Sequence, residues 1–406
     1  MPLRNDTVAA PHLGGRTAVV LFAFILIAFV TESQLTQYVQ TTLAYRQPFF
    51  IFYVVHSSFF IIFPLHLLYL TTTTKYSASS LIKGLSIAIT DHLSPLETSG
   101  LSEFPFFKFS RLVIVLTVGV TYPGLLWFAA ISLASVSDVT AIWNTNAFFA
   151  YLISVKMFGL KWEPRRLVAV CLATLGVIVV VYGGNAAENS ESMPEGSSMS
   201  SSARFIKPSA PLVGNVLTLI ASFGYGLYQV LYKIYAALPS DPEIISDRQY
   251  EQIIDGESEH LQSNLTSANA ISAEDTVYPP PFGLHPNLLT SAIGFCTFAM
   301  LWIPIPILHY TGVEIFRYPA NLTTVFAISG IAFSGVVFNA GFMVLLGVWG
   351  PIITSVGNLL TIVLVVFSDV IFGSGTDSLT VWSLLGSGVI VAAFGVLAYD
   401  MFTRGS

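Results

Sequence analysis

Charged residues are scarce in this sequence: Asp, Glu, Lys and Arg make up 10% of its 406 residues, against about 25% in soluble proteins. With 54% hydrophobic residues and a mean hydropathy of +0.72, too few charges remain to cover a water-facing surface. A soluble enzyme, a nucleic-acid-binding protein and a disordered chain are therefore excluded. Cysteine is also rare. Cys171 and Cys296 lie inside apolar segments, so neither a disulfide framework nor a metal site is expected.

Motifs for catalysis and nucleotide binding are missing as well. The absence of a Gly-x-x-x-x-Gly-Lys loop argues against an ATP-driven pump. No His-Glu-x-x-His metal motif and no Gly-x-Ser-x-Gly nucleophile motif occurs. Asp91 and His92 form an isolated pair and are a weak catalytic signal. We expect no enzyme activity, no cofactor and no bound metal ion.

Apolar residues are abundant and fall in segments of about twenty, the length that crosses a bilayer as a helix. Backbone polar groups find no water in lipid, so each segment is predicted to be helical. The predicted fold class is therefore an all-α membrane protein, with the lipid bilayer as a partner. The ten predicted transmembrane helices cover residues 17–40, 47–70, 111–134, 137–158, 164–183, 211–237, 286–309, 321–346, 351–373 and 378–401.

The distribution of Lys and Arg sets the predicted orientation. With a cytosolic N-terminus, thirteen of these residues lie on the cytosolic side and four on the other side. Both termini are therefore placed in the cytosol. The predicted organisation begins with a cytosolic tail (1–16) and a first five-helix repeat (17–183), followed by a flexible non-cytosolic linker (184–210). A second five-helix repeat (211–401) follows, interrupted by an acidic cytosolic loop (239–284), and the chain ends in a cytosolic tail (402–406).

Three short matches relate the two halves. Residues 140–144 align with 354–358 at a shift of 214, and the same shift brings 157–159 onto 371–373. Gly-Val-Ile-Val occurs at 176–179 and again at 388–391. Because each half crosses the membrane five times, the second half is predicted to be inverted relative to the first. Many secondary transporters have this arrangement, with the binding site near the bilayer midplane.

The sequence from Ser135 to Asn144, followed by residues 166–170 and 176–179, resembles the drug/metabolite transporter superfamily with its EamA-type repeats. Within it, the chain is most similar to solute carrier family 35, and there to fungal and animal members linked to thiamine or without a known solute. The resemblance implies a carrier of a small organic solute in an endomembrane, Golgi-like or vacuole-like, rather than in the plasma membrane. Thiamine-like cations, nucleotide-sugars and drugs all remain open.

Two ionisable residues lie deep in the predicted spans, where such groups are costly and often functional. Glu32 follows fifteen uncharged residues in the first span and can load and release a proton, which suits coupling to a pH gradient. His56 lies near the middle of the second span and can bond to Glu32 or to solute. The structural alternatives are a carboxyl bonded to a neighbouring helix and a neutral histidine bonded to a helix carbonyl.

Amide and hydroxyl groups occupy equivalent places in the two repeats. Asn144 and Asn358 align, and Thr354 and Thr361 share a helical face with Asn358. Amides both donate and accept hydrogen bonds, which suits a polar organic solute. The alternative is hydrogen bonding that only holds the helices together.

Tyr225, Gln229 and Lys233 follow one another at four-residue spacing in the sixth span and give one face aromatic and polar character. Such a face can stack on a ring or bind a cation through the π system. Lys233 lies near the cytosolic interface, and the tyrosines alternatively serve as interfacial anchors.

The sequence therefore predicts a multi-pass secondary transporter that moves a polar organic metabolite by alternating access, with protons as the candidate coupling ion. Its predicted partners are a small-molecule solute and lipid, without nucleic acid. The predicted solute contacts are Glu32, His56, Asn144, Tyr225, Gln229, Asn358, Thr354 and Thr361. The alternative is a membrane receptor or scaffold that transports nothing and uses the acidic loop to bind a partner.

Overall fold

The computed structural model describes residues 16–94, 104–134, 139, 142–158, 167–176, 178–179, 211–238, 276–364 and 381–404. Within these ranges every regular element is a helix, which confirms the predicted all-α class for this part of the chain. The predicted linker 184–210 and residues 239–275 of the acidic loop lie outside the described residues.

The helices of the predicted first half cover residues 16–158. They are α1 (Arg16–Thr41), α2 (Pro48–Ser57), the 3-10 helix η1 (Ser58–Ile61), α3 (Ile62–Thr73), α4 (Ala78–Leu93), α5 (Phe106–Leu133) and α7 (Asn146–Met157). A short apolar helix, Leu167–Gly176, follows them.

The helices of the predicted second half lie within residues 211–404. They are α9 (Pro211–Tyr235), α12 (Leu284–Met300), α13 (Pro304–Thr311), α14 (Leu322–Asn358) and α16 (Val381–Arg404).

Four helical segments of the described chain are long and apolar enough to cross a membrane. They are Val19–Gln40, Pro48–Thr73, Phe106–Ile131 and Leu322–Gly347, and α12 with α13 forms a fifth candidate span that is bent by 46°. They coincide with the first, second, third, eighth and seventh predicted spans. The predicted fourth, fifth, ninth and tenth spans are represented by shorter helices or extend outside the described residues. The predicted sixth span corresponds to α9, which is not among these candidates.

Two breaks in the second half have local causes. Pro304 begins α13, because a proline fits the first turn of a helix and cannot continue a preceding one. Gly350 has φ 76° and ψ 172°, which interrupts α14 just before Pro351. The interruption lies between the predicted eighth and ninth spans, and Thr354 Oγ1 donates to the carbonyl of Gly350 at 2.8 Å.

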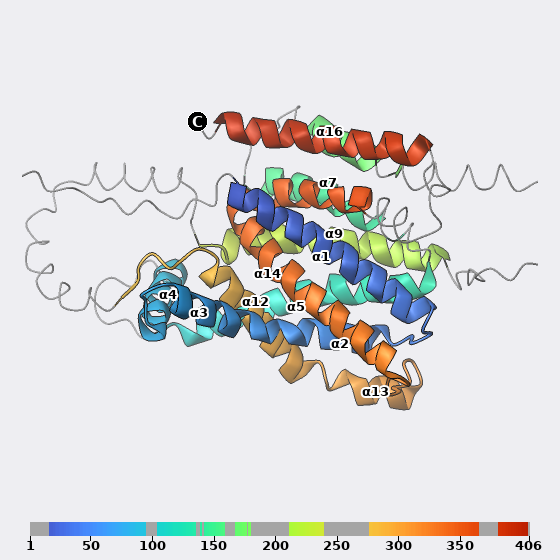
Figure 1. The fold of residues 1–406 in the computed structure, drawn as a ribbon, viewed down its shortest axis with the longest axis horizontal. Coiled ribbons are helices and arrows are strands. Elements are labelled where there is room, and N and C mark those ends of the chain that lie inside the picture. Colours follow the sequence, from blue (N-terminus) through green and yellow to red (C-terminus); the bar gives the residue numbers. More distant parts are fainter. Residues whose placement is uncertain are drawn as a thin grey trace, which may run out of the picture.

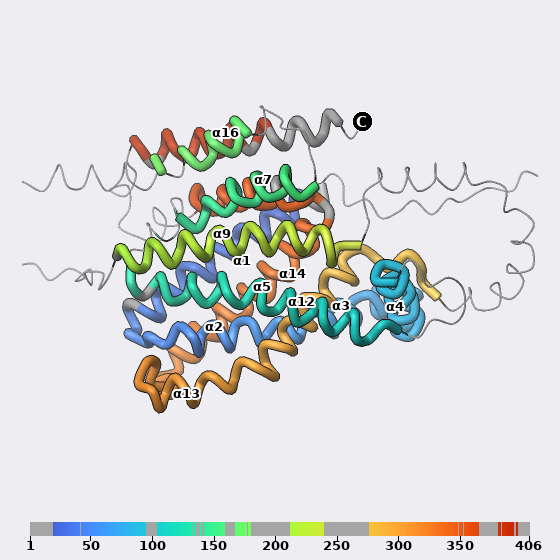
Figure 2. Tube along the Cα trace, turned by 180° about the vertical axis from the view of Figure 1, so that it is seen from behind, coloured from blue at the N-terminus to red at the C-terminus, as the bar shows by residue number. Residues whose placement is uncertain are grey.

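The helices form a layered bundle in which neighbours in space are often far apart in sequence (Figures 1 and 2). α1 packs along α14, and α9 lies between α5 and α7. α12 packs across α2, η1, α3 and α5. α16 lies along one edge of the bundle in Figure 1. Helices of the predicted first and second halves therefore share one core.

α12 approaches η1 closely. Gly294 faces the backbone of Phe59 and Phe60, and a Cβ at residue 294 would lie 2.8 Å from the carbonyl carbon of Phe59. Ser291, one turn earlier in α12, donates its hydroxyl to the carbonyl of Phe60. The lack of a side chain at Gly294 lets the two backbones touch, and the serine bonds them together.

α4 was not predicted, since the sequence analysis placed it in the connection between the second and third spans. It is amphipathic and, at 16 residues, too short to be taken for a span. Ser77 caps it by accepting from the backbone N–H of Ser80 at 3.1 Å. Its Leu81 and Leu85 pack against Leu284 at one end of the bundle.

Candidate functional site

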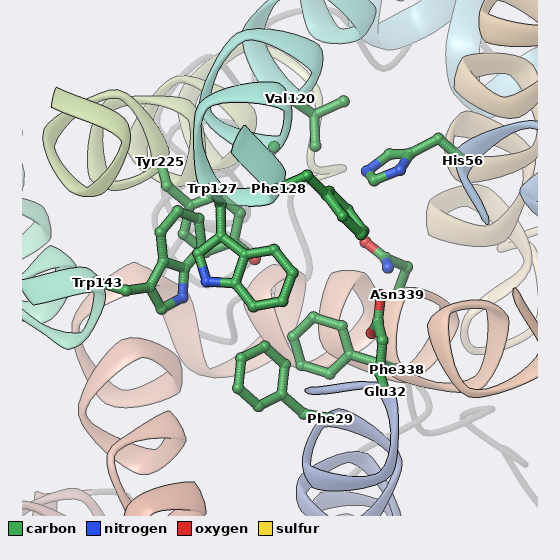
Figure 3. A pocket seen from close by; sticks show the side chains of 11 residues that line it. Phe29, Glu32, His56, Val120, Trp127, Phe128, Trp143, Tyr225, Phe338 and Asn339 are labelled. Carbon is green, nitrogen blue, oxygen red and sulfur yellow. The ribbon is translucent and has the colours of Figure 1, made fainter. Parts of the chain in front are cut away.

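A cavity of about 500 Å³, including its mouth, opens inside the bundle (Figure 3). Its walls come from α1, α2, α5, the helical residues 142–144, α9 and α14, so both predicted halves contribute. The lining residues are Phe29, Glu32, His56, Val120, Gly124, Trp127, Phe128, Trp143, Tyr225, Phe338 and Asn339.

One side of the cavity is an aromatic wall of three rings, Trp127, Trp143 and Tyr225 (Figure 3). The rings of Trp143 and Tyr225 lie 4.8 Å apart at an interplanar angle of 32°, and those of Trp127 and Trp143 lie 6.2 Å apart. Phe29 and Phe338, which also line the cavity, pack at 4.9 Å. The wall is therefore preassembled from rings on α5, residues 142–144 and α9.

Glu32 is the acidic residue among the described residues that line the cavity. Its side chain is only 7% exposed, and it forms no hydrogen bond or ion pair with any residue that the structure describes. Gly335 of α14 makes room for it. A Cβ at residue 335 would lie 3.2 Å from Glu32 Oε1 and 2.7 Å from Val55 Cγ1. The glycine thus lets α1 bring its carboxyl group between α2 and α14.

His56 faces the cavity from α2 and is held by its own helix. Its Nδ1 lies 3.3 Å from the carbonyl oxygen of Phe52, and its ring stacks on Phe52 at 3.9 Å. Because a carbonyl oxygen can only accept, Nδ1 is the donor. In the neutral ring Nε2 then carries a lone pair. His56 and Glu32 share the cavity without a hydrogen bond between them.

Asn339, one turn after Gly335 on α14, is a cavity residue that the sequence analysis missed. Its Nδ2 donates to the carbonyl of Gly335 at 2.9 Å, which fixes the amide. In Figure 3, Asn339 and Glu32 lie on the side of the cavity opposite the aromatic wall. Its signal in the sequence is a polar residue inside an apolar span, whereas Asn144 was singled out by its alignment with Asn358 in the other repeat. Trp127 and Trp143 gave no such signal, because tryptophan is common in cores.

Glu32, His56 and Tyr225 are the three predicted contacts that line the cavity. Gln229 is fully buried in a polar network between three helices. Its Nε2 donates to Asn146 Oδ1 at 3.3 Å, and its Oε1 accepts from Ser355. Gln229 therefore links α9 to α7 and to the end of α14.

The other predicted contacts also lie outside the cavity lining. Asn144 is buried next to Trp143 in the chain, and Trp143, not Asn144, lines the cavity. Thr354 bonds back across the break at Gly350, and Thr361 Oγ1 donates to the carbonyl of Asn358 at 2.7 Å. Asn358 itself is 3% exposed, among residues that pack against α7.

The described residues contain no group of three or more His, Cys, Asp or Glu side chains that could hold a metal ion. The chemistry of this cavity consists of one carboxyl, one imidazole and one amide group set against aromatic rings. It can bind a small organic molecule by stacking and by polar contacts, and Glu32 and His56 are the groups able to exchange a proton.

Comparison with known proteins gives relatives along nearly the whole chain. The chain is 23% identical to the thiamine-repressible mitochondrial transport protein THI74 of Saccharomyces cerevisiae, over 93% of this chain and 90% of that protein. It is 24% identical to an uncharacterized transporter of Schizosaccharomyces pombe, over 94% of this chain and 95% of that protein. No protein-family model matches the chain.

Among the solved structures that match, one crystal structure has a TM-score of 0.50 and 12% identity, over 96% of this chain and 99% of that one. This is a likeness of fold alone. The names of the two relatives, together with the apolar helices described above, indicate an integral membrane transport protein and not an enzyme.

Proposed function

We propose that this protein is a secondary transporter that moves a polar organic metabolite across a membrane by alternating access. The observation that carries the proposal is the cavity between the two predicted halves. It combines an aromatic wall with the carboxyl group of Glu32, the imidazole of His56 and the amide of Asn339. A site between two like halves is one that two alternative packings of those halves can open to either side.

The proposed architecture is ten spans in two inverted five-helix repeats, as in the drug/metabolite transporter superfamily and solute carrier family 35. Two features support it. The break at Gly350 falls between the eighth and ninth predicted spans, and residues of both halves line one cavity. Labelling single cysteines near each terminus with a membrane-impermeant reagent tests it, because an even number of spans requires both termini on the same side.

Among the predicted solute contacts, we propose Glu32, His56 and Tyr225 as direct contacts and add Asn339 and Trp143. Gln229 and Thr354 are assigned to contacts between and within helices, because their hydrogen bonds are made there. Asn144, Asn358 and Thr361 lie outside the cavity lining in this arrangement of the bundle.

We also propose that transport is coupled to protons through Glu32. A carboxyl group that is buried without a hydrogen bond or ion pair from the described residues is costly to keep charged, so it readily takes up a proton. Such a group changes its charge when the cavity opens to a different side.

Counterflow in proteoliposomes tests the function. Purified full-length protein is reconstituted in vesicles loaded with each member of a solute panel, and exchange of labelled solute is measured with and without a pH gradient. We expect exchange for at least one solute class, and a response to the gradient that Glu32→Gln removes. Glu314→Gln, a matched change outside the cavity, should keep it. Absence of exchange with every solute would instead favour a receptor or scaffold.

The proposed location is an internal membrane. The family resemblance favours an endomembrane of the Golgi or vacuole type, and the budding-yeast relative is named as mitochondrial, which is also an internal membrane. Microscopy of a fluorescent fusion of the full chain, scored against markers for Golgi, vacuole, mitochondrion and plasma membrane, distinguishes these locations. Signal at the plasma membrane alone would contradict the proposal.

A further inference from the structure

The charge balance of the cavity narrows the class of solute. Of the described residues that line it, Glu32 alone carries an acidic group, and none is a lysine or arginine. The nearest candidate base is His56, whose Nδ1 is taken up by the carbonyl of Phe52. A nucleotide-sugar or another phosphate-bearing anion would find no fixed positive charge here to replace its lost water.

The cavity instead contains the components that bind a cation. Aromatic faces attract positive charge, tryptophan most strongly. Trp127, Trp143 and Tyr225 form a wall on one side, and the carboxyl group of Glu32 lies on the other (Figure 3). Both sides line the same cavity, so one bound solute can contact the aromatic wall and the carboxyl group together.

The lack of a hydrogen-bond or ion-pair partner for Glu32 also favours a cationic solute. An ionised carboxylate in such a place needs a counter-charge, and none of the residues that the structure describes supplies one. Glu314, the matched carboxylate at the end of the bundle, receives two backbone hydrogen bonds at 3.0 Å. The group that lacks a partner is therefore the one that faces the cavity.

We infer that the solute is an organic cation with a ring or quaternary ammonium group, which stacks on Trp143 and Tyr225 and pairs with the carboxylate of Glu32. This inference rests on the proposed function and specifies the solute class of the same cavity. It assigns Glu32 the role of counter-charge and the three-ring wall the role of selecting positive charge.

Binding to the purified full-length protein in detergent tests this inference without requiring transport. Three probes of one shape differ in charge: benzyltrimethylammonium is a permanent cation, benzyldimethylamine N-oxide is neutral overall, and benzylsulfonate is an anion. We expect the cation to bind at least about tenfold more tightly than either of the others, as charge pairs in buried sites do. Equal affinity for the N-oxide, tighter binding of the anion, or no binding of the cation would overturn the inference.

Variants separate the two parts of the site. Glu32→Gln keeps the shape and removes the charge, so cation affinity should fall about tenfold while that of the N-oxide is unchanged. Trp143→Phe should retain cation binding and Trp143→Leu should lose it, because only the first keeps a ring. Glu314→Gln removes a carboxylate outside the cavity and should leave cation affinity unchanged. Retention of cation affinity by Glu32→Gln would contradict the inference.

The two proposals fail in different ways. Cation binding without counterflow of any solute would leave the inference standing and contradict the transport function. Counterflow of a neutral or anionic solute, without binding of the cation, would support transport and contradict the cationic solute. Because the first comparison uses the unaltered chain, it does not depend on whether a variant folds.

Discussion

Glu314 and Glu32 differ in the hydrogen bonds that their carboxyl groups receive. Glu314, in the loop after α13, accepts hydrogen bonds at 3.0 Å from the backbone N–H groups of Phe49 and Phe50, in the first turn of α2. Those N–H groups have no partner within their own helix, and the N-terminal end of a helix favours negative charge. Glu32 lies in the cavity and receives no such bond. The hydrogen bonds of Glu314 therefore assign its carboxylate to the fold, whereas the carboxyl group of Glu32 stays available for a ligand or a proton.

The surroundings of Glu314 make a loop–loop contact, defined by Tyr45, Gln47, Glu314 and Arg317. The Tyr45 hydroxyl and Gln47 Nε2 both donate to the carbonyl of Arg317 at 2.9 Å, and Arg317 N–H donates to Gln47 Oε1 at 3.2 Å. Burial raises the pKa of Tyr45 to about 12, and the nearby negative charge of Glu314 contributes to the same shift. The hydroxyl therefore stays a donor near neutral pH. This contact joins the connection between α1 and α2 to that between α13 and α14.

Glu32→Gln gives the largest expected effect on activity. Loss of the carboxylate should lower uptake into proteoliposomes about tenfold or more and remove its response to a pH gradient. The melting temperature should stay unchanged or rise, since an unpartnered buried carboxyl does not stabilise the fold. Thermal unfolding followed by circular dichroism provides the second measurement. A variant that unfolds readily would mean that Glu32 is structural, like Glu314.

Gly335→Ala tests whether the cavity depends on the close approach of α1 to α14. The new methyl group would meet Val55 and Glu32, and such overpacking costs about 1–3 kcal/mol. We expect a lower melting temperature and severalfold weaker uptake per folded protein. Gly347→Ala, on the same helix but with no heavy atom within 4 Å of the new Cβ, is the matched control. Equal behaviour of the two variants would show that the approach at Gly335 is unimportant.

Gln229→Leu tests a polar side chain that, like Glu314, has hydrogen-bond partners within the fold. It lies one helical turn after Tyr225, which lines the cavity. The change removes the partner of the Ser355 hydroxyl and that of Asn146 Oδ1, at a cost of about 1–3 kcal/mol. Denaturation should report this loss, while the KM for solute should stay within about twofold, below the tenfold that 1.4 kcal/mol of binding energy represents. A large change in KM with normal stability would restore Gln229 as a solute contact.

Glu314→Gln gives the smallest expected effect on uptake. The neutral amide has one acceptor oxygen, so one of the two backbone N–H groups loses its partner, and the charge that complements the first turn of α2 is lost. Stability should fall by about 1–3 kcal/mol, measured by thermal unfolding, with uptake per folded protein unchanged. If uptake fell as much as in the Glu32 variant, the division between a structural and a functional carboxylate would be wrong.

The sequence predicted the helical class and singled out Glu32 and His56, which line the cavity, because apolar length and a rare ionisable group inside an apolar segment are local properties. It did not predict α4, whose apolar face is explained only by Leu284, distant in the chain. Length and composition alone identify four to five spans among the described residues, so the ten-span arrangement stays a proposal.

The cavity itself was only partly predictable. Trp127 and Trp143 look like core residues in sequence, and only the packing of α5, α9 and residues 142–144 turns them into a wall. Gln229 looked like a contact because it shares a helical face with Tyr225. One turn separates them, and that turn carries Gln229 from the cavity into the network with Asn146 and Ser355. Helical spacing gives the face of a residue, while depth along the neighbouring helices decides what it meets.

The contact of Gly294 with the backbone of Phe59 and Phe60 restricts how this bundle can rearrange. Sliding α12 along η1 would drive the larger neighbours of Gly294 into that backbone and break the bond from Ser291. The contact therefore opposes sliding between the second span and α12. A change in how the two predicted halves pack would have to turn about this contact or break it.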